Sequence, residues 1–87
     1  MYWDVIKVEA IAPRELAVAF SDGLQGVFRM ETSFCTGVFD PLREDALLAQ
    51  AKVEDGVVVW PNGLDLAPDA LYHEIRRSPD RRYVLNA

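Results

Sequence analysis

The stretch ELAVAFSDGLQGVFRM, residues 15–30, gives the most secure structural prediction in this chain. Its first six residues alternate in character, with Leu16, Val18 and Phe20 on one face and smaller or charged side chains on the other. Side chains of a β-strand point to opposite faces in turn, so this period of two predicts a strand with one buried face.

A turn and two further strands surround this first strand. Ser21-Asp22-Gly23 has the composition of a hairpin turn in which Gly23 takes a positive φ, and residues 24–31 then alternate again. Upstream, residues 2–11 are rich in β-branched and aromatic residues, and Pro13 ends that strand. Three consecutive strands with short connections predict an antiparallel meander.

The middle of the chain predicts a crossing segment and a helix. Residues 32–39 read as an irregular crossing whose Phe34 and Phe39 close the end of the core. Asp40 before Pro41 is a good helix start, so we expect a helix from 41 to about 50. Its apolar stripe is formed by Leu42, Ala46 and Ala49 with Leu47 or Leu48 beside it.

The second half predicts a hairpin and a last helix. Asp55-Gly56 favours a tight turn, and the continuously apolar run Val57–Trp60 belongs in the middle of a sheet. Pro68 opens a helix that ends at about Arg77, with Leu71 and Ile75 pointing inward. The order β-β-β-α-β-β-α predicts an α+β domain of two layers, a largely antiparallel sheet with helices on one face. Residues 1–77 form this single domain and residues 78–87 a basic, flexible C-terminal tail.

Composition limits the classes of function. The chain has 87 residues, a net charge of −5 and one cysteine, Cys35, so no internal disulfide can form. We therefore expect a reducing, cytoplasmic setting, and no apolar run is long enough to span a membrane. An acidic chain is also a poor coat for phosphate backbone, which disfavours a nucleic-acid partner.

Charge is distributed unevenly along the chain. Residues 1–75 carry a net charge of −8, whereas the last twelve residues carry Arg76, Arg77, Arg81 and Arg82 against Asp80 alone. One interpretation is a solvated helix end, whose arginines complement the helix dipole, followed by a frayed terminus. The other is a docking arm for an acidic surface or for RNA.

The segment Trp60–Asp65 is the most distinctive loop. In the structural interpretation Trp60 covers the core, Pro61-Asn62-Gly63 reverses the chain and Asp65 accepts hydrogen bonds from the amides of the turn. In the functional interpretation, Trp60 is an aromatic platform and the amides near Gly63 bind a ligand or a partner strand.

Catalytic and metal chemistry have few candidates. Cys35 and His73 are the only pair that could form a thiol nucleophile and its base, and we interpret them as a core residue and a surface residue. His73 and Asp69, one turn apart, supply at most two metal ligands, with Asp65 as a third. Neither glycine-rich phosphate-binding pattern occurs. We therefore expect no catalytic residues, no metal and no cofactor.

The chain resembles a family of small bacterial proteins known as domain of unknown function 2442. The resemblance covers roughly residues 3–74, and its specific part is Trp60-Pro61-Asn62-Gly63 with the Leu64-Asp65-Leu66 that follows. It implies a β3-α-β2-α domain; some members are joined to a helix-turn-helix segment, and some are encoded beside a small toxin-like partner. The residues after 77 do not show the helix-turn-helix of the fused members, so we expect no direct DNA binding of that kind, and the resemblance implies no catalytic residues.

Three hypotheses follow. The first is a non-enzymatic interaction module, a homodimer, that binds and regulates a small basic protein as an antitoxin does. The second is a nucleic-acid-linked regulator that contacts phosphate through Arg76–Arg82. The third is a small enzyme or ligand-binding domain that uses the Trp60–Asp65 loop.

Overall fold

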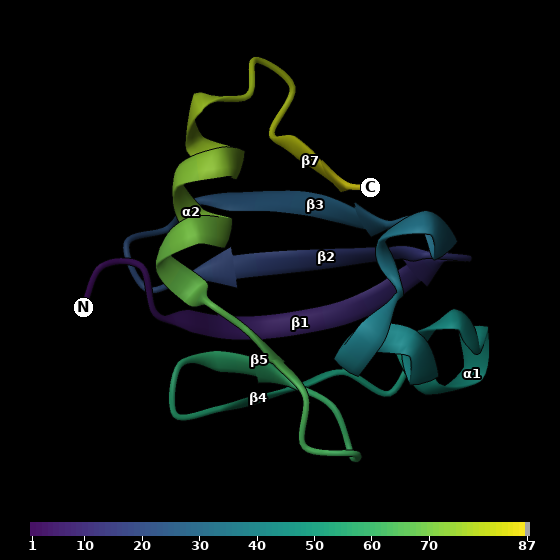
Figure 1. Ribbon diagram of the computed structural model, residues 1–87. Coiled ribbons are helices and arrows are strands. Elements are labelled where there is room, and N and C mark those ends of the chain that lie inside the picture. The colour runs from purple at the N-terminus through teal and green to yellow at the C-terminus, as the bar shows by residue number, and fades with distance from the viewer. Residues whose placement is uncertain (87) are drawn as a thin grey trace.

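The computed structural model describes residues 1–86 and has the α+β class that the sequence predicts. One sheet has the strand order β1-β2-β3-β7, formed by β1 (Val5–Ala12), β2 (Glu15–Phe20), β3 (Gln25–Met30) and β7 (Arg82–Leu85). A smaller sheet has the order β4-β5-β6, formed by β4 (Lys52–Glu54), β5 (Val57–Val59) and β6 (Asp65–Leu66). The helical elements are two 3₁₀ segments, Thr32–Phe34 and Gly37–Arg43, and the helices α1 (Asp45–Leu48) and α2 (Pro68–Arg77). Figure 1 shows α2 lying across the larger sheet and α1 at the far end of its strands.

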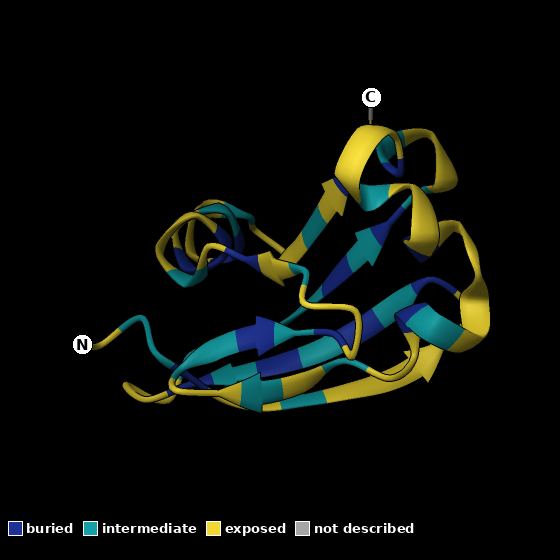
Figure 2. Cartoon of the chain, turned by 60° about the horizontal axis from the view of Figure 1, so that its bottom comes forward, coloured by how far each residue is buried: buried dark blue, intermediate teal, exposed yellow. Residues whose placement is uncertain are grey.

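The antiparallel meander is confirmed. Strand β2 pairs with β1 on one side and with β3 on the other, in the registers Val8↔Val18 and Leu16↔Phe28. The side chains that the alternation predicts to face inward are buried, and Figure 2 shows buried and half-buried positions alternating along the strands. The first strand begins three residues later than expected, at Val5, and has register shifts near Ile6 and Ile11.

The first hairpin turn is also confirmed. Gly23 has a φ of +96°, and the amide of Phe20 donates to the carbonyl oxygen of Leu24 at 2.8 Å. The carboxylate of Asp22 accepts from the amide of Leu24 at 2.9 Å. A short polar side chain that bonds the backbone two residues ahead is a usual stabiliser of such turns.

Helix α2 begins at Pro68, ends at Arg77 and buries Leu71, Tyr72 and Ile75. It can approach the sheet closely because β3 has no side chain at Gly26. A Cβ added there would collide with Cγ2 of Ile75 and lie 2.7 Å from the carbonyl oxygen of Arg81. The glycine therefore sets the separation between the helix and the sheet.

The C-terminal tail corrects the expectation of a frayed end. Residues 82–85 form β7, which pairs parallel to β3 in the register Phe28↔Tyr83 and buries Leu85. Tyr83 and Leu85, two residues apart on β7, both face the core. Burial of these two side chains explains why the arginine-rich segment is ordered. The strand extends the ordered part of the chain beyond residue 77, and Ala87 lies outside the described residues.

The predicted helix from 41 to about 50 is wrong. The chain instead forms the 3₁₀ segment Gly37–Arg43, with Pro41 inside it, and then the single turn α1. Leu42 and Leu48 are buried, but Ala46 and Ala49 are exposed, so the predicted apolar stripe faces solvent at those two alanines. Asp40 does not cap a helix and instead pairs with Arg43 at 3.1 Å.

The second hairpin is confirmed, whereas its place in one continuous sheet is not. Asp55 and Gly56 have φ values of 50° and 80°, as the tight turn requires, and β5 is the central strand of its sheet. That sheet is separate from the larger one. The tip of the hairpin meets β1, where the amide of Val5 donates to the carbonyl oxygen of Gly56 at 2.9 Å. Only Val58 is fully buried, so the two neighbouring valines are half-exposed on the outer face.

The core lies between the larger sheet, α2 and the smaller sheet, and Cys35 is buried in it, as expected. Phe34 and Phe39 pack against each other, with ring centroids 5.2 Å apart, and cover one end, as predicted. Within residues 1–86 no helix is both long enough and apolar enough to cross a bilayer.

Candidate interaction surface

The Trp60–Asp65 loop reverses the chain as predicted. The amide of Gly63 donates to the carbonyl oxygen of Trp60 at 3.0 Å, and Gly63 has a φ of +89°. The side chain that accepts from the turn is Asn62, whose Oδ1 lies 3.2 Å from the amide of Leu64. Asp65, to which the sequence assigned this role, lies exposed on β6 opposite Val59.

Trp60 is a core anchor. Its side chain is 2% exposed, and its Nε1 donates to the carbonyl oxygen of Leu48 at 2.9 Å. The bond ties the end of α1 to the loop, and the buried ring is not available as a surface platform. The exposed part of this candidate is limited to Asn62, Gly63 and Asp65.

The four arginines are exposed, and Arg77, Arg81 and Arg82 make contacts within the fold. Arg77 pairs with Glu74, and Arg81 donates to the carbonyl oxygens of Arg76 and Ser78. Arg82 pairs with Glu15 at 3.0 Å, which lowers the pKa of that carboxyl. These arginines and the Trp60–Asp65 loop lie at opposite ends of the molecule (Figure 1). The structure therefore does not bring the predicted site residues together.

Arg14 is a buried residue with several hydrogen bonds to which no sequence pattern pointed. It is 8% exposed, with a φ of 66° in the turn between β1 and β2. Its Nε donates to the carbonyl oxygen of Met30 at 2.9 Å and its Nη1 to that of Leu42 at 2.8 Å. Nη1 also lies 3.1 Å from Oδ1 of Asp45. A left-handed backbone is costly for arginine, and these bonds offset that cost.

The remaining contacts of Arg14 complete its environment. Nη2 lies 3.4 Å from Sγ of Cys35, and Nη1 lies 3.3 Å from the carbonyl oxygen of Arg43. Every one of these partners comes from the segment 30–45, which is remote in sequence from the turn. No local pattern marks an arginine as buried, so a single sequence offers no signal for this role.

A hollow of about 360 Å³ lies beside Arg14, between the β1–β2 turn and α1. We call it the β1–α1 hollow. Its lining is mostly small and apolar and includes Ala10, Ala12, Leu16, Ala46, Leu48 and Ala49. Two carboxylates, Glu15 and Asp45, also line it, and the side chain of Asp45 is 68% exposed. Ile11, which lies between two of the lining alanines, is itself half-exposed.

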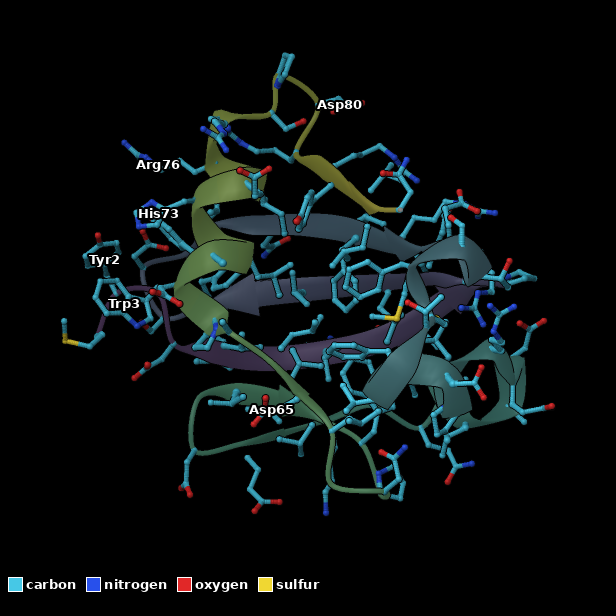
Figure 3. The ribbon with its side chains drawn as sticks, viewed as in Figure 1. Tyr2, Trp3, Asp65, His73, Arg76 and Asp80 are labelled. Carbon is cyan, nitrogen blue, oxygen red and sulfur yellow. The ribbon has the colours of Figure 1, made fainter. Side chains whose placement is uncertain are left out.

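Aromatic side chains gather at the opposite end of the sheet. Tyr2 is 47% exposed, and its ring centroid lies 4.9 Å from that of Trp3 and 5.1 Å from that of Tyr72. Figure 3 shows Tyr2 and Trp3 beside His73 of α2. The hydroxyl of Tyr72 donates to Oδ2 of Asp22 at 2.5 Å, which lowers the pKa of Asp22 and raises that of Tyr72.

Candidates for catalysis and metal binding are not assembled. Cys35 is buried beside Arg14, whereas His73 lies on the exposed side of α2. Among residues 1–86 no group of three or more histidine, cysteine or carboxylate side chains is placed to hold a metal ion. The surface features that the structure does present are the β1–α1 hollow and the aromatic cluster around Tyr2.

Comparison with known proteins identifies one family. The family model described as "Protein of unknown function (DUF2442)" matches residues 5–77, which agrees with the resemblance seen in the sequence. No curated protein and no solved structure matches this chain.

Proposed function

We propose that this chain, which belongs to the DUF2442 family, is a non-enzymatic module that binds a basic segment of another protein in the β1–α1 hollow. The observation that carries the proposal is the lining of the hollow, where small apolar side chains lie beside the exposed carboxylate of Asp45. Interface anchors are large side chains that fill such depressions, surrounded by a polar rim.

The alanines make the hollow receptive to an apolar side chain. Ala10 and Ala12 of β1 face Ala46 and Ala49 across it, and none of these four is buried by the protein itself. Filling this space with aliphatic or aromatic groups removes apolar surface of both partners from water. A segment with one or two large apolar residues fits this description.

The negative charge of the chain favours a positively charged partner. The chain carries a net charge of −5. At the hollow, Glu15 is paired with Arg29 and Arg82, whereas the carboxylate of Asp45, which pairs with Arg14, stays 68% exposed and open to a cationic group. Complementary charge raises association rates and disfavours acidic competitors. The partner segment is therefore basic as well as apolar.

A regulatory role of the antitoxin type is consistent with such binding. In this proposal the module binds the apolar segment of a small basic partner and so holds that partner in an inactive state. The setting is the bacterial cytoplasm, where a chain with one buried cysteine needs no disulfide.

The test compares two matched substitutions in helices. Ala46→Trp fills the hollow from α1, whereas Ala70→Trp places the same side chain at an exposed position of α2, beside a separate and smaller hollow. Tagged protein is used to capture partners from lysate of the source cells, with and without nuclease, and the retained proteins are identified by mass spectrometry. We expect a basic protein whose retention does not depend on nuclease, which the wild type and Ala70→Trp retain and Ala46→Trp does not.

Three results would contradict the proposal. Retention of the partner by both tryptophan variants would place the binding surface elsewhere. Loss of all retained material after nuclease would favour the nucleic-acid hypothesis and the segment Arg76–Arg82. An acidic partner would contradict the charge argument.

A further inference from the structure

The larger sheet has one face that α2 does not cover, and this open face is built in rows. Across the strands the rows are Lys7, Ala19 and Gln25, then Glu9, Ala17, Val27 and Arg82, then Glu15, Arg29 and Val84. The centre is made of small side chains, and a shallow hollow of about 400 Å³ lies over Ala17, Ala19 and Val27.

Charges on this face are balanced. Lys7 pairs with Glu9 at 4.0 Å, and Arg29 pairs with Glu15 at 3.3 Å and with Glu31 at 2.6 Å. Arg82 also pairs with Glu15. The three positive and three negative side chains of the face cancel, so the whole net charge of −5 belongs to the rest of the molecule.

We infer that the open face binds a second copy of this chain, sheet against sheet. Two copies of an acidic protein repel each other through most orientations, but the balanced face can meet its own copy without that repulsion. A two-fold interface places the same patch on both sides, so it needs a patch that complements itself. Alternating Lys, Arg and Glu side chains around a small apolar centre satisfy that need.

Geometry supports packing of two such faces. Sheets stack about 10 Å apart with strands inclined by about 30° when their facing side chains interlock. Alanine and valine in the centre allow that approach, whereas the longer charged side chains lie around them.

The size of the face sets the strength of the dimer. Four strands about 4.8 Å apart and about six residues long cover roughly 400 Å² on each copy. The total of about 800 Å² is below the roughly 1,200 Å² of a standard stable interface. The dimer is therefore weak and forms at high protein concentration.

Sedimentation equilibrium on the full chain tests the inference, from about 10 μM to 1 mM, the range in which an interface of this size associates. The wild type should exceed its monomer mass of 9.8 kDa as concentration rises. Ala17→Glu places a charge at the centre of the face and should weaken association at least about tenfold, since like charges then oppose each other. Ala70→Glu on α2 is the matched control and should associate as the wild type does.

A cross-linking measurement decides the case if Ala17→Glu fails to fold. Because Cys35 is buried, Ala19→Cys introduces the one accessible thiol of the described chain, and Ala70→Cys is its control. Under mild oxidation the first should give a disulfide-linked dimer at concentrations where the second does not. A wild type that stays monomeric at the highest concentration would overturn the inference, as would equal cross-linking of the two cysteine variants. Neither experiment involves Ala46, so both are independent of the proposed function.

Discussion

The meander of residues 15–30 and the segment of residues 31–50 are held in different ways. The meander is regular, and its register follows from alternating side chains and short turns. The second segment has two 3₁₀ pieces and one helical turn, and its backbone is held by Arg14 and Trp60 from other parts of the chain. Local pattern builds the first region, whereas long-range hydrogen bonds from large side chains build the second.

Replacement of Arg14 should have the largest effect. Arg14→Met leaves the carbonyl oxygens of Met30, Leu42 and Arg43 without their donor, at a cost of about 3–5 kcal/mol in the free energy of unfolding. Chemical denaturation measures this loss. Hydrogen exchange should show that protection disappears from residues 37–48 before it disappears from the meander.

Two controls sharpen this first test. Arg77→Met alters an exposed arginine and should change stability by less than about 0.5 kcal/mol. Arg14→Lys keeps the charge but not the fork of donors, so it should remain destabilised. Full stability of the lysine variant would show that charge alone holds the segment.

Gly26→Ala should break the regular region at its contact with α2. The added Cβ meets Ile75 and the carbonyl oxygen of Arg81, and overpacking of this kind costs about 1–3 kcal/mol. Thermal or chemical unfolding gives the change. In a strand without such a contact the same substitution would stabilise the protein, so an increase in stability would contradict the close approach.

Trp60→Phe should loosen the irregular region from its other side. The substitution keeps an aromatic ring but leaves the carbonyl oxygen of Leu48 without its donor, which costs about 1–2 kcal/mol. Trp3→Phe is the matched control, because Trp3 is half-buried and its ring contacts Tyr2. Equal losses for the two variants would show that the indole N–H of Trp60 adds nothing to stability.

The smallest effect concerns the link between the first hairpin turn and α2. The hydrogen bond from Tyr72 holds the pKa of Asp22 below its ordinary value, and Arg76 adds to this. A carboxyl with a lowered pKa in the folded state contributes stability that is present above about pH 4 and is lost as pH falls through the folded pKa.

Tyr72→Phe should therefore reduce the dependence of the melting temperature on pH at the acid end. Thermal melts between about pH 2 and pH 7 measure it, a range that spans the titration of an aspartate. Tyr2→Phe changes an exposed tyrosine of the same cluster and should leave the pH profile as it is in the wild type. A profile that does not change in Tyr72→Phe would rule out a contribution from this hydrogen bond.

Elements built from adjacent residues could be predicted from the sequence, whereas elements held by distant residues could not. The strands of the meander, the Asp55-Gly56 turn and α2 were predictable because their signals lie within a few adjacent residues. The 3₁₀ segment Gly37–Arg43 and the single turn α1, where a helix from 41 to about 50 was predicted, were not, because Pro41 at a good starting position carries no information about the carbonyl oxygens that Arg14 holds. Strand β7 was missed because four arginines near the C-terminus obscure the alternation of Tyr83 and Leu85.

Candidate surfaces were harder to predict than elements. The Trp60–Asp65 loop was recognised as a turn, but the burial of Trp60 depends on α1, to which it donates. The β1–α1 hollow and the open face each combine residues from two or more elements, so neither appears in any single stretch of sequence.

Local pattern and composition are enough to predict the α+β class, the meander, the two tight turns and the acidic character of the chain, because periodicity, glycine conformation and charge act locally or as sums. The parallel pairing of β7, the burial of Arg14 and the separation into two sheets arise only in the folded chain. These features depend on hydrogen bonds and packing between residues far apart in the chain, whose partners exist only once the fold has formed.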